Sequence, residues 1–286
     1  MIKKKRKKST KLGATIYIKK RVKMKNLIGI VQGRLSISPK NRLQFFPKNW
    51  RKEFELANKI GFDFIEFFTQ RKINKSNPVW DIKKLDEYKR LSKLYNLKIL
   101  NFCDDYVISN CIRKKRTQNY LFKLLKNLHR LNIKNLILPM YGKSNLTDKN
   151  YSQYVTTIKN IIKNSKKIKI LIESNISPKE FIDFKKKINS KKVLFLFDTG
   201  NRVNLKRDMY NDLIRMNKHI EHIHIKDKNL KKQNVKLNTG LVNFNKIFKI
   251  LKKNKYRKNF TFETTRGNNP IKTAKYNLEF LKKKLS

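Results

Sequence analysis

The sequence predicts a single (β/α)8 barrel, a closed ring of eight parallel strands in which a helix follows each strand. Three observations support this prediction. Short apolar runs alternate with amphipathic helical patterns, there are eight such pairs, and they occupy about 260 residues, the usual size of this barrel. An open doubly wound sheet is the competing architecture, but it would not need eight units.

Eight apolar runs have the character of buried parallel strands. Strands that are covered on both faces are apolar throughout and do not alternate between apolar and polar residues. In chain order the runs are LIGIVQG (27–33), FDFIEFF (62–68), LKILNFC (97–103), IKNLILPM (133–140), IKILIES (168–174), VLFLFDT (193–199), IEHIHIKD (220–227) and NFTFETT (259–265).

Helical patterns lie between these runs. Two apolar stripes have helical spacing: Leu121, Leu124, Leu125 and Leu128 form the first, and Phe244, Ile247, Phe248 and Leu251 form the second. Helix starts are also marked. Ser177-Pro178 with Glu180 predicts an N-cap, a proline in the first turn and a capping-box acid, and Asn269-Pro270 opens the last helix in the same way.

The chain is strongly basic, with 72 Lys+Arg against 20 Asp+Glu and a formal net charge of +52. Such a charge ordinarily points to a polyanion partner. The lysines are spread along the whole chain, however, and Lys, Asn, Ile and Phe are heavily used, as in an AT-rich coding bias. We therefore interpret the charge as a solvated surface coat and expect no specific nucleic-acid partner.

Cysteine content and hydropathy indicate the compartment. The two cysteines, Cys103 and Cys111, provide no disulfide framework, which favours a reducing environment. No apolar run approaches the length of a membrane helix, so we expect no membrane association and a cytoplasmic location.

The first 23 residues differ from the rest. The segment MIKKKRKKSTKLGATIYIKKRVK is basic, and its apolar piece is too short for a signal-peptide core. We interpret residues 1–23 as a disordered extension or as the product of a start codon placed upstream of Met24, and residues 24–286 as the barrel domain. A basic arm that binds nucleic acid is the alternative.

Acidic residues are concentrated where the predicted strands end. In barrels of this kind the chemistry lies on the loops at the carboxyl ends of the strands. Seven of the chain's 20 acids fall there: Glu66, Asp104, Asp105, Glu173, Asp198, Asp227 and Glu263. Because acids are scarce in this chain, their concentration at one rim predicts a functional site.

Four of the residues on this rim form a candidate metal site. The last four predicted strands are neighbours in a barrel, and they end in Glu173, Asp198, His224 and Glu263. Three carboxylates and one imidazole suit one divalent ion such as Mn²⁺, Mg²⁺, Co²⁺ or Zn²⁺. The alternative is that the acids are separate and pair with the abundant lysines.

The four histidines are not equivalent. Strand alternation places His222, His224 and Lys226 on one face of their strand, with His222 deeper in the barrel. We therefore predict that His222 is a hydrogen-bonded core residue and that His224 is the ligand. His129 lies in a helical pattern and His219 precedes a strand, and neither is given a role.

From about Met24 to the C-terminus the chain resembles the xylose-isomerase-like TIM-barrel superfamily, in its sugar and sugar-phosphate isomerase/epimerase branch. The resemblance rests on GIVQGRL (29–35), FELANKIGFDFIEFF (54–68), LIES (171–174), FDTGN (197–201), HIHIKD (222–227), LNTGLVNF (237–244) and FTFET (260–264). It implies a single-metal site at the same four residues. Asn238 and Asn243 depart from the family, which commonly has a glycine and an acid there, so the resemblance does not predict the shape of this loop.

The resemblance implies an isomerase that acts on a sugar or sugar phosphate through a metal-stabilised enediolate. Glu173 and Glu263 are then the acid and base, and reprotonation of either the opposite face or the neighbouring carbon decides between epimerisation and isomerisation. Lys226 and Arg266 are expected to bind the substrate, because barrel phosphate sites often use the loops after strands seven and eight. A homo-oligomer is compatible with this interpretation.

Two other functions stay open at this point. The superfamily also contains endonucleases that act at abasic DNA sites, and a charge of +52 would suit DNA. The resemblance implies that those enzymes hold three metal ions and use several more histidines to do so. This chain has four histidines in all, and it carries Asn201, not a histidine, three residues after Asp198. The other alternative is a non-catalytic basic binding protein on a barrel scaffold.

Overall fold

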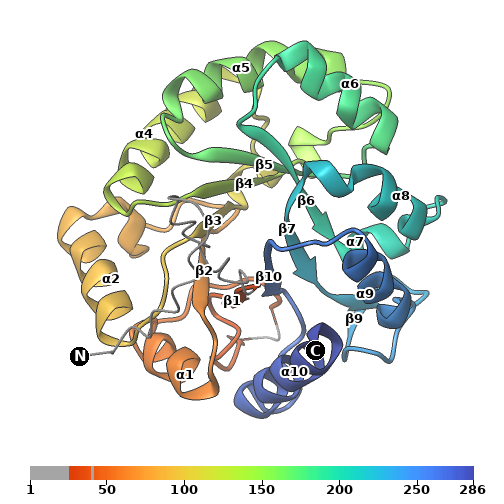
Figure 1. Ribbon diagram of the computed structural model, residues 1–286. Coiled ribbons are helices and arrows are strands. Elements are labelled where there is room, and N and C mark those ends of the chain that lie inside the picture. The colour runs from red at the N-terminus through yellow and green to blue at the C-terminus, as the bar shows by residue number, and fades with distance from the viewer. Residues whose placement is uncertain (1–25, 40–41) are drawn as a thin grey trace, which may run out of the picture.

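A barrel of parallel strands forms the centre of the fold (Figure 1). The computed structural model describes residues 26–39 and 42–286, so the extension expected over residues 1–23 lies outside the described residues. Within them, eight strands close in the order β1-β10-β7-β6-β5-β4-β3-β2, which confirms the predicted architecture. Their bounds are β1 (Ile28–Val31), β2 (Phe64–Thr69), β3 (Asn101–Asp104), β4 (Asn135–Pro139), β5 (Lys169–Glu173), β6 (Val193–Asp198), β7 (Ile220–Ile225) and β10 (Asn259–Phe262).

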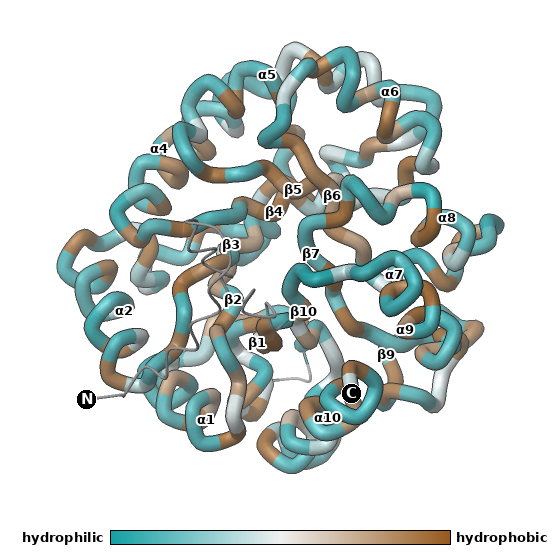
Figure 2. Tube along the Cα trace, viewed as in Figure 1, coloured by the Kyte–Doolittle hydropathy of each residue, from teal (hydrophilic) through white to brown (hydrophobic). Residues whose placement is uncertain are grey.

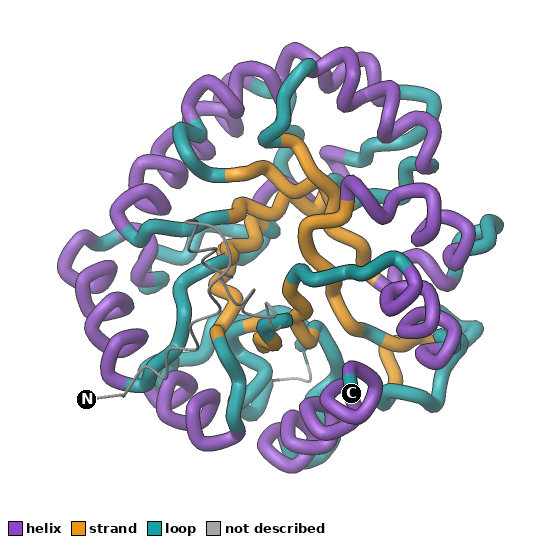
Figure 3. The backbone as a smooth tube through the Cα atoms, viewed as in Figure 1, coloured by secondary structure: helices purple, strands orange, loops and turns teal. Residues whose placement is uncertain are grey.

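Helices surround this ring (Figure 3). A helix of at least eight residues follows each barrel strand: α1 (Lys52–Ile60), α2 (Ile82–Leu94), α4 (Lys115–Arg130), α5 (Val155–Asn164), α6 (Pro178–Ile188), α8 (Met209–Met216), α9 (Phe244–Lys253) and α10 (Pro270–Leu285). The two predicted leucine and phenylalanine stripes are buried on α4 and α9. No helix in the described ranges is both long and apolar enough to cross a bilayer.

The apolar core has two parts, and Figure 2 shows the hydrophobic strands at its centre. The larger part fills the space between the strands and the helices. The smaller part lies inside the barrel and comprises Val31, Phe68, Cys103, Ile137, Leu171 and Leu196. The other inward-facing residues include buried polar ones from β2, β3, β7 and β10, namely Glu66, Asn101, His222, His224 and Thr261. The barrel interior therefore contains both an apolar group and a buried polar group, and β2 and β3 contribute to both.

The loop after β7 contains a small two-stranded sheet that the sequence did not predict. The predicted strand 220–227 ends at Ile225, and β8 (Asp227–Lys228) then pairs with β9 (Asn234–Val235) in antiparallel fashion. Asp227 bends the chain here because its carboxylate accepts hydrogen bonds from the backbone N–H groups of Lys228 (2.9 Å), Gly240 (2.8 Å) and Val242 (3.1 Å). Gly240 permits this approach, since a Cβ there would lie 2.4 Å from Asp227 Oδ1.

The two departures from the family pattern in this loop have local explanations. Asn238 has a φ of 67°, a left-handed conformation that glycine adopts freely and that asparagine tolerates better than most residues. Asn243 is the N-cap of α9, and its side chain accepts a hydrogen bond from Lys246 N at 3.0 Å. Asparagine is among the best N-cap residues, so the helix start is satisfied without an acid.

Two helix starts have the predicted N-cap and first-turn proline, but Glu180 does not complete the predicted capping box, because Ser177 N donates to Asp148 Oδ1 at 2.7 Å. Ser177 Oγ accepts a hydrogen bond from Glu180 N at 3.3 Å, with Pro178 in the first turn of α6. Asn269 Oδ1 accepts from Lys272 N at 3.0 Å, with Pro270 at the start of α10. These caps satisfy backbone donors that the helix itself leaves free.

Ser177→Ala should lower the free energy of unfolding by about 1 kcal/mol, because the α6 cap loses its acceptor. The urea midpoint of unfolding measures this change. Ser152→Ala is the matched control, since Ser152 is exposed and its hydroxyl has no hydrogen bond to the described residues. An equal midpoint for the two variants would show that the cap does not stabilise the helix.

Candidate active site

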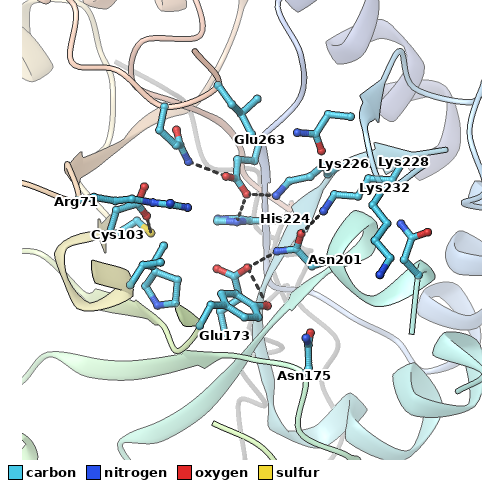
Figure 4. A pocket seen from close by; sticks show the side chains of 18 of the residues that line it. Arg71, Cys103, Glu173, Asn175, Asn201, His224, Lys226, Lys228, Lys232 and Glu263 are labelled. Carbon is cyan, nitrogen blue, oxygen red and sulfur yellow. Dashed lines mark hydrogen bonds and ion pairs between the residues drawn. The ribbon is translucent and has the colours of Figure 1, made fainter. Parts of the chain in front are cut away.

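A cavity of about 410 Å³ opens at the carboxyl ends of the barrel strands. Figure 4 shows side chains that line it, among them Glu173, His224, Lys226 and Glu263. They reach the cavity because inward-facing positions at the strand ends point into the mouth of the barrel. The cavity therefore contains several of the side chains that the sequence singled out.

The four residues predicted as metal ligands come together. Glu173, Asp198 and His224 each offer one ligand atom, and these atoms all lie within 4.8 Å of one another. Glu263 Oε2 lies 3.3 Å from His224 Nδ1. The strands that carry the four, β5, β6, β7 and β10, are consecutive neighbours in the barrel, and Asp198 pairs directly with His224 across β6 and β7.

Two buried polar atoms face each other inside this group and have only ion-pair neighbours, Glu263 Oε2 and Lys226 Nζ. They are His224 Nδ1 and Asp198 Oδ2, which lie 3.9 Å apart. A divalent cation between the two would satisfy both, and a set of carboxylates and imidazole is a donor set that such cations accept. The residues present therefore fit a metal ion.

Lys226 also lies within the acid group. Its Nζ is 2.9 Å from Asp198 Oδ2 and 2.6 Å from Glu263 Oε2, and the side chain is buried. Gly200 makes room for it, because a Cβ at residue 200 would lie 2.8 Å from Lys226 Cγ. Lys226 thus neutralises part of the negative charge of the site.

The two glutamates have different electrostatic environments. Burial, and then repulsion by Asp198, raises the pKa of Glu173 to about 8 in the protein without a metal ion. Burial would also raise the pKa of Glu263, but Lys226 and His224 outweigh it and hold that pKa well below its usual range. The two carboxylates therefore hold protons with different strengths.

Neutral polar side chains, which sequence reasoning did not select, hold both glutamates. Glu173 Oε1 accepts hydrogen bonds from Asn201 Nδ2 (2.8 Å) and from the Tyr141 hydroxyl (3.3 Å). Glu263 Oε1 accepts one from Gln44 Nε2 at 2.6 Å. Asn201 had a signal, since it stands three residues after Asp198 and its backbone N–H donates to Asp198 Oδ1 at 2.7 Å. Gln44 and Tyr141 lie on loops without a distinctive pattern.

Below the cavity, Glu66 connects both histidines of β7. Its Oε1 lies 2.7 Å from His224 Nε2 and its Oε2 lies 3.1 Å from His222 Nε2. Burial would raise the pKa of Glu66, but the two histidines outweigh it and lower that pKa. Glu66 is completely buried and does not line the cavity, so its predicted place among the rim acids is wrong. The prediction placed Glu66 too close to the mouth of the barrel, because Glu66 lies within β2 and not at its end.

Glu66, His222 and His224 also form a second group with metal-ligand spacing. Here the carboxylate is already saturated, since Asn101 Nδ2 and Thr261 Oγ1 also donate to Glu66 Oε2 at 3.1 and 3.2 Å. His222 further lies 2.8 Å from Thr261 Oγ1, which confirms it as a hydrogen-bonded core residue. We interpret this group as a hydrogen-bond network that orients His224.

The three remaining rim acids have separate roles. Asp105 lines the cavity, and burial followed by repulsion from Glu263 raises its pKa to about 7. Asp104 instead accepts hydrogen bonds from Thr69 Oγ1 and from the Tyr120 hydroxyl, and so joins β3 to α4. Asp227 shapes the loop after β7, as described above.

Arg266 does not line the cavity that contains the acids. Its guanidinium donates to three backbone carbonyls of the loop after β1: Gly33 O (2.7 Å), Arg42 O (2.8 Å) and Leu43 O (2.9 Å). The sequence correctly indicated a position after β10, but backbone acceptors on a neighbouring loop leave no pattern in a sequence. Lys226, by contrast, lies in the cavity.

Comparison with known proteins agrees with this geometry. No curated protein matches the chain in sequence. Among solved structures, a D-psicose 3-epimerase from Clostridium cellulolyticum H10 with D-tagatose superposes with a TM-score of 0.72 at 14% identity, over 91% of this chain and 99% of that one. A D-allulose 3-epimerase from Methylomonas sp. gives 0.70 at 20% identity, over 92% and 99%. The IOLI protein with a bound zinc atom gives 0.67 at 14% identity, over 90% and 96%.

At these identities the structural likeness establishes the fold alone. The family assignment comes from a sequence model described as "Xylose isomerase-like TIM barrel", which matches residues 54–284. This range covers seven of the eight barrel strands and all four candidate ligands. The chain therefore belongs to the xylose isomerase-like TIM barrel family.

Proposed function

We propose that this protein is a divalent-metal-dependent sugar epimerase or isomerase. The observation that carries the proposal is the convergence of Glu173, Asp198, His224 and Glu263 at the ends of four neighbouring strands. Three of the four, Glu173, His224 and Glu263, line a cavity open to small molecules. The similar solved structures include sugar 3-epimerases, and this likeness supports the substrate class.

The four residues would hold one metal ion, either Mn²⁺, Mg²⁺, Co²⁺ or Zn²⁺. The convergence of Glu173, Asp198 and His224 supports this assignment, as does the zinc atom bound in the similar IOLI protein. When bound, such an ion acts as a Lewis acid that polarises the carbonyl of a keto-sugar and acidifies the neighbouring C–H.

Glu173 and Glu263 are the proposed proton-transfer pair. Figure 4 shows their carboxylates on opposite sides of the His224 ring, and their strands are separated by β6 and β7. One carboxylate takes the proton from the sugar carbon and the other returns a proton to the opposite face, which inverts that carbon. Two separate carboxylates favour this epimerisation, because an isomerisation needs one group that moves the proton to the neighbouring carbon.

Neighbouring side chains would hold this pair in place. Asn201 and Tyr141 fix the carboxylate of Glu173, and Gln44 fixes that of Glu263. Lys226 would keep Glu263 ionised and contact the sugar oxygens. For Arg266 we propose a bracing role in place of the expected substrate contact, since its donors hold the loop that carries Gln44.

His224→Ala and Asp198→Ala should each remove tight binding of Mn²⁺, because each deletes one ligand of the proposed ion. Calorimetric titration of the metal-free protein measures the affinity. Unchanged affinity in both variants would contradict the proposed site.

Glu66→Gln should weaken metal binding about 10- to 100-fold, the usual effect of removing the group that orients a histidine ligand. The substitution leaves all four ligands in place and removes the carboxylate 2.7 Å from His224 Nε2. Glu279→Gln is the matched control, since it makes the same change at an exposed position of α10.

The urea midpoints of both variants separate a loss of orientation from a loss of folding. A Glu66→Gln protein that stays folded and binds Mn²⁺ with wild-type affinity would show that Glu66 does not position His224.

Glu173→Gln and Glu263→Gln should each lower turnover at least about 10²-fold, because the amide cannot accept the proton. Exchange of the sugar C–H with deuterated water, followed by NMR for both epimers, measures the proton-transfer step directly. Metal occupancy must be determined in the same samples, since both residues are proposed ligands.

Each variant is expected to block exchange from one epimer more strongly than from the other, because each carboxylate serves one face. Near-normal exchange in Glu263→Gln at full metal occupancy would rule out the two-carboxylate mechanism. Equal loss from both epimers in one variant alone would assign both steps to a single residue and favour isomerisation.

A further inference from the structure

One wall of the cavity carries positive charge that the acid group does not use. Of the part of the chain that the structure describes, four Lys and Arg side chains line the cavity: Arg71, Lys226, Lys228 and Lys232. Lys226 is paired with Asp198 and Glu263. Among the described residues, none of the other three forms an ion pair with a carboxylate.

Lys228 is the most informative of these cations. It is only partly exposed, and its Nζ donates to Asn201 Oδ1 at 2.9 Å. Asn201 in turn donates to Glu173 Oε1 at 2.8 Å, so a single side chain separates this ammonium from the proposed proton-transfer pair. An ammonium group has three donors, and burying it without an anion is unfavourable.

The backbone around Lys228 is fixed. Asp227 holds the chain on one side, and Leu241 N donates to Lys228 O at 2.8 Å on the other. Between β8 and β9, Lys232 N donates to Asn229 O at 2.9 Å, which closes a tight turn and places Lys232 at the same wall of the cavity. Figure 4 shows Lys228 and Lys232 together, with Arg71 on the opposite side.

A further donor without a partner lies close by. Asn204 lines the same cavity, and its Nδ2 is buried with no hydrogen bond to the described residues. This amide belongs to the loop after α7 (Thr199–Val203), not to the hairpin that carries the lysines. The free amide of Asn204 is therefore independent evidence that this wall binds a ligand with a hydrogen-bond acceptor.

We propose that the substrate carries a phosphate monoester, which Lys228 and Lys232 bind with help from Asn204. This inference rests on the proposed function, and it specifies the substrate class of that same site. Lysine binds phosphate as a compact point charge, and two neighbouring ammonium groups match the charge of a phosphate monoester, about −1.5 to −2 at neutral pH, better than the single charge of a carboxylate. Arg71 lies across the cavity and does not share this wall.

The placement also agrees with a general feature of these barrels, which often bind phosphate on the loops after strands seven and eight. The sequence had assigned that role to Lys226 and Arg266. In the structure Lys226 forms ion pairs and Arg266 donates to backbone carbonyls, so neither cation is free to bind phosphate. We therefore assign phosphate binding to Lys228, two residues after Lys226 on the same loop.

The test compares the affinities of four ligands for protein loaded with Mn²⁺. The ionic strength is kept constant, and the Mn²⁺ occupancy of each sample is measured. Calorimetry gives Kd values for D-fructose 6-phosphate, D-fructose, D-glucuronate and inorganic phosphate. We expect the phosphorylated sugar to bind at least about tenfold more tightly than fructose, which corresponds to about 1.4 kcal/mol. Lys228→Met should bring this ratio close to one, and Lys228→Arg should retain part of it.

Lys231→Met is the matched control, because it removes the same charge from an exposed position of the same turn. It should leave the ratio at its wild-type value. If Lys228→Met does not fold, Lys232→Met, at an exposed position, should still lower the affinity for both fructose 6-phosphate and inorganic phosphate.

The proposal is overturned by a wild-type ratio near one, by an unchanged ratio in folded Lys228→Met, or by tighter binding of glucuronate than of fructose 6-phosphate. Proton exchange in deuterated water separates this failure from that of the proposed function. If fructose 6-phosphate binds through Lys228 but its C–H does not exchange, the phosphate site is supported and the epimerase activity is contradicted. If the C–H of free fructose exchanges and phosphorylation does not improve binding, the epimerase activity is supported and the phosphate site is contradicted.

Discussion

Repulsion between buried carboxylates is the constraint on which the rest of the site depends. Glu173, Asp198 and Glu263 project from strand ends that the closed barrel forces together, away from bulk water. Positive charge must lie among them, and Lys226 and His224 provide part of it. This need explains why a lysine is buried in a position that would otherwise be costly, and why Gly200 is required beside it. It also explains why the same place suits a divalent cation.

The charge balance continues into the layer beneath the cavity. Glu66 accepts from the side chains of His222, Asn101 and Thr261 and lies against Nε2 of His224, so one carboxylate joins β2, β3, β7 and β10. A ring held at Nε2 has its Nδ1 directed at Asp198 and Glu263. The orientation of His224 is thus set from inside the barrel, while loops set the positions of Gln44 and Tyr141 from outside.

The strands and the principal acids could be predicted because both depend on local pattern. A fully buried parallel strand is apolar to its end, so the first charge after it, such as Asp198 or Glu173, lies at the barrel mouth. Glu66 shows the limit of this rule, since a charge inside a strand can lie in a polar interior layer. Gln44, Tyr141 and the bracing role of Arg266 could not be predicted, because neutral side chains and backbone carbonyls from distant loops leave no periodic signal. The same holds for β8 and β9, which exist because Asp227 binds backbone groups up to 15 residues away.

Closure of the barrel has a consequence for the order in which the molecule forms. The seam joins β1 to β10, with Leu27 N and Asn259 Oδ1 in contact across 232 residues of chain. Thr261 lies on the strand that completes the ring and Glu263 directly follows that strand, while their partners Glu66 and Gln44 are near the start of the described chain. During synthesis the first half of the barrel therefore leaves the ribosome long before these partners exist. Contacts of such large sequence separation form slowly, and until β10 docks the open sheet has two unpaired edges, which are the places where sheets associate with other chains.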